Sequence, residues 1–165
     1  ASLEFKRQKI KLMSPLDVRA ALVSFRADGA KKELPPGSVW GPKEQYHVWK
    51  TLQSNVGGGT PDHLGLAAAQ CLIAEDKAKK DRLRLVLVSA DGGSDNISAT
   101  IAAKEALKSQ GVIVKAAGIG AGAQAVKATY YPDGENLPDF DAVPDWAAQE
   151  VIAEAKKLNP KKIKR

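Results

Sequence analysis

Apolar residues in this chain fall into two patterns, continuous runs and positions spaced as on one face of a helix. Continuous runs are typical of strands covered on both faces, and they predict strands over residues 18–25, 83–89 and 112–117. Helices are expected at about residues 43–53, 61–74, 96–110, 124–130 and 144–158, with a weak edge strand at 137–143. Strands that alternate with helices predict an α/β fold. We expect a three-layer Rossmann-like sandwich with a mainly parallel central sheet and helices on both faces.

The clearest helix start follows the run Gly57-Gly58-Gly59-Thr60-Pro61. Thr60 is expected to be the N-cap, and Pro61 suits the first helical position because its missing N–H is not needed there. Positions spaced by three and four residues predict a stripe that faces the core, formed by Leu64, Ala67, Ala68, Cys71 and Leu72. Cys71 is the only cysteine, and on this stripe we expect a small buried residue rather than a reactive thiolate.

Residues 31–50 are expected to form a long connection with one short edge strand, because prolines and glycines interrupt the pattern there. This connection holds His47 and an aromatic group that fits either the core or an exposed contact patch, the core being favoured: Trp40, Tyr46 and Trp49. His63, in the first turn of the next helix, is expected to pack or to face solvent. Two distant histidines and one cysteine do not supply the three or four close ligands of a zinc site.

The length of the chain and the distribution of its charges indicate one domain with basic ends. The chain has 165 residues and a formal net charge of +6, and its lysines and arginines concentrate in residues 1–11 and 156–165. We expect a domain over residues 1–158 and a basic tail over 159–165. The tail suits contact with nucleic acid or an acidic partner, or it is a solvated end. With no apolar run near the roughly 20 residues of a membrane span and no secretory signal, an intracellular protein away from the membrane is expected, cytoplasmic or nuclear.

The central strand is followed by oxygen-bearing side chains, namely Ser89, Asp91 and Ser94. Ligands of open parallel sheets bind beyond the carboxyl ends of the strands, and the hydroxyl of Thr60 is expected near the same edge. Hydroxyls, one carboxylate and waters suit a hard cation such as Mg²⁺ or Ca²⁺. The alternative is an ordinary strand-to-helix turn in which Asp95 or Asn96 is the helix N-cap.

A second glycine motif, Gly118-x-Gly120-x-x-Ala123, follows a strand and precedes a helix. This is the setting of a dinucleotide fingerprint, and Asp139 lies where a ribose-binding acid is expected. Little chain remains for the second half of a dinucleotide-binding fold, so glycines that permit a tight strand exit are the preferred interpretation. No Gly-x-Ser-x-Gly nucleophile motif occurs, and a nucleotide-binding enzyme remains only an alternative.

Several stretches in register resemble the von Willebrand factor A (vWA) domain, also called the I domain. The resembling stretches are 21–25 (Ala-Leu-Val-Ser-Phe) for its second strand, 57–61 (Gly-Gly-Gly-Thr-Pro) for its threonine loop, 85–92 (Leu-Val-Leu-Val-Ser-Ala-Asp-Gly) for its fourth strand and aspartate, 112–120 (Val-Ile-Val-Lys-Ala-Ala-Gly-Ile-Gly) for its fifth strand, and 144–158 for its closing helix. The resemblance covers nearly the whole chain from residue 18.

One part of the family pattern is absent. The metal motif Asp-x-Ser-x-Ser at the end of the first strand does not occur, nor does that strand. Ala1-Ser2-Leu3 matches the tail of the motif, with Ser2 as its last serine, so we expect a vWA-like domain that is incomplete at its N-terminus. The other interpretation is a domain that has lost its metal site.

The resemblance implies a protein-binding module rather than an enzyme, acting as a subunit of an intracellular complex. A metal-ion-dependent adhesion site would hold Mg²⁺, or Ca²⁺ or Mn²⁺. Thr60 would be a direct ligand, Asp91 a direct or water-mediated one, and Ser2 a third. A protein partner would supply a carboxylate to the cation. The alternative is a metal-independent structural subunit of a larger assembly, associated with nucleic acid through residues 156–165.

Overall fold

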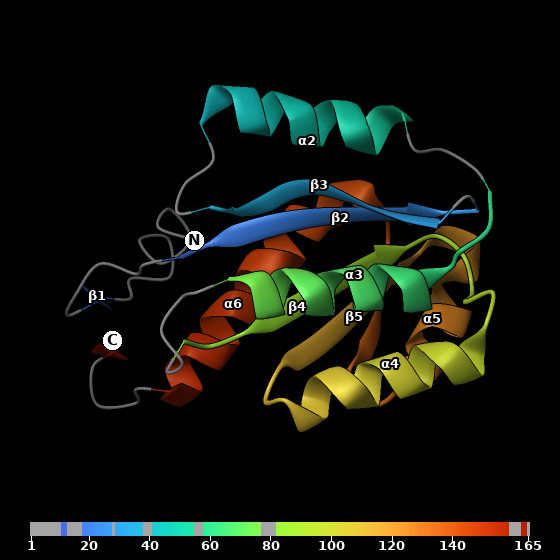
Figure 1. Ribbon diagram of the computed structural model, residues 1–165. Helices are drawn as coiled ribbons and strands as arrows, with labels where there is room; N and C mark the ends of the chain where they lie inside the picture. Colours follow the sequence, from blue (N-terminus) through green and yellow to red (C-terminus); the bar gives the residue numbers. More distant parts are fainter. Residues whose placement is uncertain are drawn as a thin grey trace.

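The structure is a computed structural model that describes residues 11–12, 18–27, 29–37, 41–54, 58–76, 82–158 and 163–164. Its helices are α2 (Pro42–Ser54), α3 (Asp62–Glu75), α4 (Ile97–Ser109), α5 (Ala123–Thr129) and α6 (Val143–Leu158), with 3-10 turns η1 (Gly120–Gly122) and η2 (Phe140–Ala142). Its strands are β1 (Lys11–Leu12), β2 (Ala20–Arg26), β3 (Gly29–Gly37), β4 (Leu85–Ala90), β5 (Ile113–Ile119), β6 (Gly134–Leu137) and β7 (Ile163–Lys164) (Figure 1).

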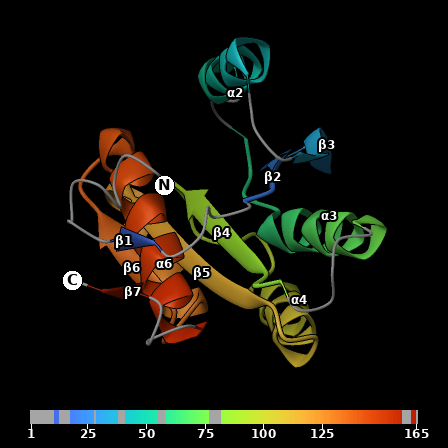
Figure 2. The same cartoon turned by 90° about the vertical axis from the view of Figure 1, so that its left-hand side faces the viewer.

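The main sheet is parallel and has the strand order β4-β5-β6. Leu85 of β4 pairs with Ile113 of β5, and Ala116 of β5 pairs with Gly134 of β6. Figure 2 shows α6 on one side of this sheet and α3 and α4 on the other. The expected three-layer α/β sandwich with a mainly parallel central sheet is therefore confirmed. Since α4 follows β4 and α5 follows β5, both helices begin at the edge where the strands end.

A second sheet is the antiparallel hairpin of β2 and β3, in which Arg26 pairs with Gly29. β3 is longer than the short edge strand expected there, although it contains Pro35 and Pro36. Prolines are tolerated in a strand that pairs on one side only, and β3 pairs with β2 alone among the strands that the structure describes. Within the same residues no strand joins β2 to β4, so the hairpin and the parallel sheet remain two separate sheets.

The two ends of the described chain meet in a third, very short sheet. Lys11–Leu12 pairs antiparallel with Ile163–Lys164. Part of the expected basic tail is therefore extended and paired, while residues 159–162 and 165 lie outside the described residues.

The core lies between the parallel sheet and helices α3, α4 and α5. Its buried members include Leu66, Val88, Leu107, Val114, Ala116, Val126 and Tyr130. On the opposite face of the sheet, α6 contributes Trp146, which is 6% exposed, and Ile152, which is 2% exposed. Full burial of one such side chain stabilises the folded chain by roughly 1.5–3 kcal/mol, so the apolar strands hold the helices on both faces.

The expected core stripe of α3 is mostly wrong, although the helix itself is confirmed and Leu72 is buried as expected. Leu64 is 42% exposed, and Ala67 and Cys71 are exposed as well. The buried face carries Asp62, Gly65, Leu66 and Leu72. Gly65 allows close packing on the hairpin, because a Cβ there would lie 2.7 Å from the Phe25 ring. The helix is apolar on nearly every side, so helical spacing alone fits more than one face.

The expected edge strand at 137–143 is also misplaced. The strand is β6, which covers Gly134–Leu137 and pairs with Ala116–Ile119 of β5, while Phe140–Ala142 forms η2. Three of its four residues are not apolar. Backbone pairing with β5 fixes this strand, and the hydrophobic pattern does not report such pairing.

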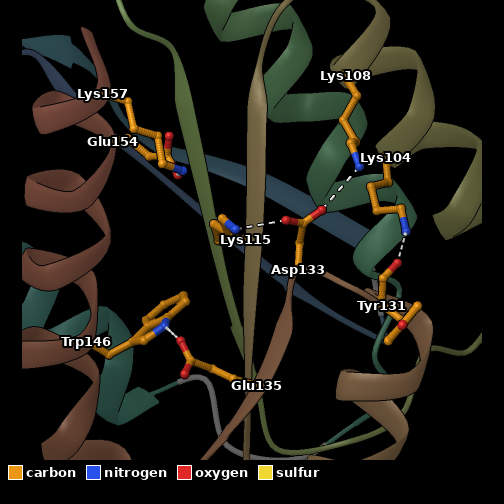
Figure 3. A network of polar contacts seen from close by, with 9 residues as sticks. All are labelled: Lys104, Lys108, Lys115, Tyr131, Asp133, Glu135, Trp146, Glu154 and Lys157. Atoms are coloured by element: carbon orange, nitrogen blue, oxygen red, sulfur yellow. Dashed lines mark hydrogen bonds and ion pairs between the residues drawn. The ribbon is translucent and has the colours of Figure 1, made fainter. Parts of the chain in front are cut away.

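A carboxylate ties α4, β5 and β6 together beside the sheet (Figure 3). Asp133 accepts hydrogen bonds from Lys115 Nζ at 2.8 Å and from Lys108 Nζ at 3.1 Å. Nearby, the buried Lys104 donates to the carbonyl of Tyr131 at 3.3 Å. On the α6 side, the indole of Trp146 donates to Glu135. Charged side chains thus fix the loop between α5 and β6.

Candidate functional site

Three loops meet at the carboxyl edge of the parallel sheet: residues 58–60 before α3, residues 91–95 after β4 and residues 120–122 after β5. We call this group of residues the rim. The Asp95 amide donates to the Thr60 carbonyl at 3.0 Å. A Cβ on Gly92 would lie 2.8 Å from Thr60 Oγ1, and Gly122 has no room for one because it faces the Asp91 carbonyl. The threonine loop (residues 58–60) and the aspartate loop (residues 91–95) are therefore in direct contact.

The structure brings Thr60 and Asp91 to the same edge, as the sequence predicted. Thr60 is half-buried and Asp91 is exposed. Thr60 is not the N-cap, however, because α3 begins at Asp62 and Pro61 occupies the cap position without a side-chain hydrogen bond. The start of α3 does not use the Thr60 hydroxyl, which lies against Gly92 instead. Ser2, the third predicted ligand, lies outside the described residues.

A second carboxylate at the rim, that of Asp95, was not among the three predicted metal ligands. The sequence offered Asp95 or Asn96 as N-cap of the following helix, and the structure assigns Asn96, whose Oδ1 accepts from the Ala99 amide at 3.0 Å. Asp95 is exposed, and its carboxylate lies so close to Gly59 that this glycine has no space for a Cβ. The rim thus combines the Thr60 hydroxyl with two exposed carboxylates.

Ser94 also lies in the rim, but its hydroxyl is bonded to a different carboxylate. Its hydroxyl donates to Asp62 Oδ1 at 2.6 Å and lies 2.7 Å from Thr100 Oγ1. Asp62 is 2% exposed, and its carboxylate also accepts from Thr100 Oγ1 at 2.6 Å and from Tyr130 Oη at 2.8 Å. Sequence reasoning missed this network, because its only local signal is one acid in the first turn of an apolar helix.

Tyr130 is a reliable donor to Asp62. Burial raises the pKa of the Tyr130 phenol well above its ordinary value, and the negative charge of Asp62 and the hydrogen bond to it raise this pKa further. The hydroxyl is therefore protonated at neutral pH and donates to Asp62.

The residues of the rim fit a hard divalent cation better than a soft one. Carboxylate and hydroxyl oxygens are ligands of Mg²⁺, Ca²⁺ and Mn²⁺, and Mg²⁺ commonly keeps several waters. In the part of the chain that the structure describes, no three His, Cys, Asp or Glu side chains form a metal-binding group. Thr60, Asp91 and Asp95 would therefore hold a cation weakly by themselves, and further ligands must come from water or from other segments.

The second glycine motif has a packing role. A Cβ on Gly118 would lie 2.5 Å from the backbone of Ala123, and Gly122 faces the backbone of Asp91 and Gly92. Asp139, the expected ribose-binding acid, caps η2 by accepting from the Ala142 amide at 3.1 Å. These contacts favour the interpretation of a tight strand exit over a dinucleotide fingerprint.

The histidines, the aromatic group and Cys71 do not belong to the rim. His47 belongs to α2, and its Nε2 lies 3.2 Å from Glu33 Oε2. His63 is half-buried, and its Nδ1 is buried without a hydrogen-bond partner among the described residues. Tyr46 is 61% exposed, which contradicts a core position, while Trp40 and the side chain of Trp49 are outside the described residues. Cys71 is exposed rather than buried.

Comparison with known proteins gives a fold and no family. No family profile matches the chain, and no curated protein matches it. A solved structure of proximal thread matrix protein 1 from the mussel byssus is 25% identical over 75% of this chain, with a TM-score of 0.57. Manganese-loaded Plasmodium vivax TRAP protein is 15% identical over 79% of the chain, also with a TM-score of 0.57.

These likenesses support a vWA-like fold, since TRAP is a vWA-domain protein. The chain spans only 33% of the mussel protein and 55% of the TRAP chain. None of the helices in the described ranges is both long enough and apolar enough to cross a membrane.

Proposed function

We propose that this chain is a protein-binding module that uses a divalent cation at the rim, rather than an enzyme. The observation that carries the proposal is the contact between the threonine loop and the aspartate loop. The Thr60 hydroxyl lies against Gly92, and the Thr60 carbonyl accepts from the Asp95 amide. Two segments about thirty residues apart in the sequence thereby present hydroxyl and carboxylate oxygens at one edge of the sheet.

Each rim residue has a distinct part in this proposal. Thr60 is a direct hydroxyl ligand, Asp91 binds directly or through water, and Asp95 supplies further negative charge. Ser2, which lies outside the rim and outside the described residues, is the further ligand that the resemblance to the vWA domain implies. The cation is Mg²⁺, with Ca²⁺ and Mn²⁺ as substitutes, because the donors are oxygens. With few protein ligands the cation retains exchangeable waters, and a carboxylate of a partner protein replaces one of them.

The test is a Mg²⁺ titration of the ¹⁵N-labelled chain, followed by addition of acetate as the simplest carboxylate. We expect amide shifts at Gly59, Thr60 and Gly92 with Mg²⁺, and further shifts with acetate only when Mg²⁺ is present. The Thr60→Val variant removes one ligand at nearly constant volume and should weaken Mg²⁺ binding about tenfold or more.

The matched control is Glu105→Gln, which removes an exposed acid in the middle of α4. Its Mg²⁺ affinity should equal that of the unmodified chain. Weaker Mg²⁺ binding in Glu105→Gln but not in Thr60→Val would mean that Mg²⁺ responds only to net charge, because Thr60→Val leaves the charge unchanged. No shift at the rim with any of the three cations would remove the proposal.

A metal-independent structural subunit of a larger assembly is the alternative. It predicts partner binding that chelators do not change and that rising salt weakens through residues 156–165. An intracellular location, cytoplasmic or nuclear, is part of the proposal in either case.

A further inference from the structure

A buried carboxylate beneath the rim has no role in the ligand set proposed above. Asp62 is 2% exposed. Its Oδ1 accepts from the hydroxyls of Ser94 and Thr100, each at 2.6 Å, and from the His63 amide at 3.0 Å. Its Oδ2 accepts from the hydroxyl of Tyr130 at 2.8 Å. All the partners that the structure gives this carboxylate are neutral donors.

The network connects four separate segments under the rim. Asp62 begins α3, Ser94 belongs to the aspartate loop, Thr100 lies in the first turns of α4, and Tyr130 follows α5. A buried carboxylate is costly unless its oxygens are hydrogen-bonded, and hydroxyl donors to a charged oxygen form short, strong bonds. The chain therefore places these segments at fixed positions around Asp62.

The backbone connects this network to the rim at two places. Asp62 is two residues after Thr60, and Ser94 directly precedes Asp95, whose amide donates to the Thr60 carbonyl at 3.0 Å. The Asn96 amide also donates to Ser94 Oγ at 3.3 Å. If Ser94 leaves Asp62, the aspartate loop loses the side-chain bond that keeps it against the threonine loop.

We infer that Asp62 is the positioning residue of the rim: through Ser94 it fixes the aspartate loop relative to Thr60 and thereby sets the affinity of the site for a divalent cation. The second part of this inference rests on the proposed function, and the first part does not. If the network only stabilised the fold, breaking it would destabilise the whole chain and would have no specific effect on the aspartate loop.

Three variants separate these roles. Asp62→Ala removes the acceptor. Ser94→Ala removes the bond between Asp62 and the aspartate loop, together with the contacts of Ser94 Oγ with Thr100 Oγ1 and the Asn96 amide. Tyr130→Phe removes the bond at Oδ2. Amide hydrogen exchange of Asp95 reports contact between the loops. The Ala116 amide, which is bonded to the Asp133 carbonyl inside the sheet, reports unfolding of the whole chain.

We expect exchange of the Asp95 amide to accelerate about tenfold or more, relative to that of Ala116, in Asp62→Ala and in Ser94→Ala. In Tyr130→Phe both amides should change by the same factor. The inference fails if Asp95 and Ala116 accelerate together in both alanine variants. Should Asp62→Ala not fold, the comparison of Ser94→Ala with Tyr130→Phe decides the question.

Mn²⁺ affinity, measured by calorimetry, tests the second part. It should fall about 10- to 100-fold in the two alanine variants, as for other residues that orient metal ligands, and stay within a few-fold in Tyr130→Phe. A further outcome is that the unmodified chain binds no Mn²⁺ while exchange of the Asp95 amide still accelerates in the two alanine variants. In that case the positioning role stands and the proposed function is wrong. Unchanged Mn²⁺ affinity in both alanine variants overturns the link between Asp62 and the cation.

Discussion

At the scale of single residues, a few carboxylates hold distant parts of the chain together. Asp62 binds Tyr130, 68 residues away, and Asp133 binds Lys108, 25 residues away. Glu33 accepts from Ser24 of the neighbouring strand at 2.8 Å and lies beside His47 of α2. Burial raises the pKa of Glu33, but hydrogen bonds from Lys31, Ser24 and His47 outweigh it and lower the pKa below its ordinary value. Hydrogen-bond donors around Glu33 and Asp133 therefore favour the charged forms of these two acids.

Asp133→Asn should destabilise the chain in a pH-dependent way. Burial raises the pKa of Asp133, but hydrogen bonds from Lys115 and Lys108 outweigh it and hold the pKa below its ordinary value. A depressed pKa in the folded state means that the stabilisation is complete above the unfolded-state pKa, near 4, and is lost as the pH falls through the folded-state value.

Urea unfolding of both proteins at several pH values measures this effect. The difference in the free energy of unfolding should be about 1 kcal/mol at neutral pH, since the two lysines are partly exposed. It should shrink below about pH 4. A difference that is equal at pH 3 and pH 7 would show that the charge of Asp133 contributes nothing.

At the scale of elements, close contacts between backbones hold the rim together. Gly122 of η1 faces the carbonyl of Asp91 and the Cα of Gly92, while Gly118 of β5 faces the backbone of Ala123. A side chain at either glycine would push α5 away from the strand or displace the aspartate loop. These glycines are required by close packing, and their φ angles are not in the left-handed region.

Gly122→Ala should therefore destabilise the chain by about 1–3 kcal/mol, as overpacking does elsewhere. Gly37→Ala is the control, because a Cβ there meets only the Pro35 carbonyl, at 3.9 Å. Thermal unfolding of both variants measures the cost. Equal melting temperatures for the two variants would mean that the aspartate loop moves freely away from η1.

Most elements could be predicted from the sequence, because strands that are buried on both faces are continuous apolar runs. β4 and β5 lie where such runs predicted them, and so does β2, although β2 is only half-buried. The buried face of α3 could not be predicted, since that helix is apolar nearly all round and tertiary contacts, such as Gly65 with Phe25, select the face. β6 could not be placed either, because backbone pairing with β5 defines it.

At the scale of the whole molecule, topology brings the site together. Parallel strands end at one edge, so the loops after β4 and β5 meet there, and this rule places Asp91. Thr60 precedes α3 rather than following a strand, so the rule alone does not place it. The Asp62 network could not be predicted, because it depends on side-chain directions in four segments. The vWA-like fold supplies the edge, and the residues placed there carry the proposed chemistry.

The most direct measurement is the amide spectrum of the chain with substoichiometric Mn²⁺, whose unpaired electrons broaden the signals of nearby nuclei. The account predicts that Gly59, Thr60, Gly92 and Gly93 broaden first, while Val112 and Ile113, at the opposite edge of the sheet, stay sharp. Broadening at other acidic surfaces before the rim, or no broadening at the rim at all, would contradict a cation site formed by the threonine and aspartate loops.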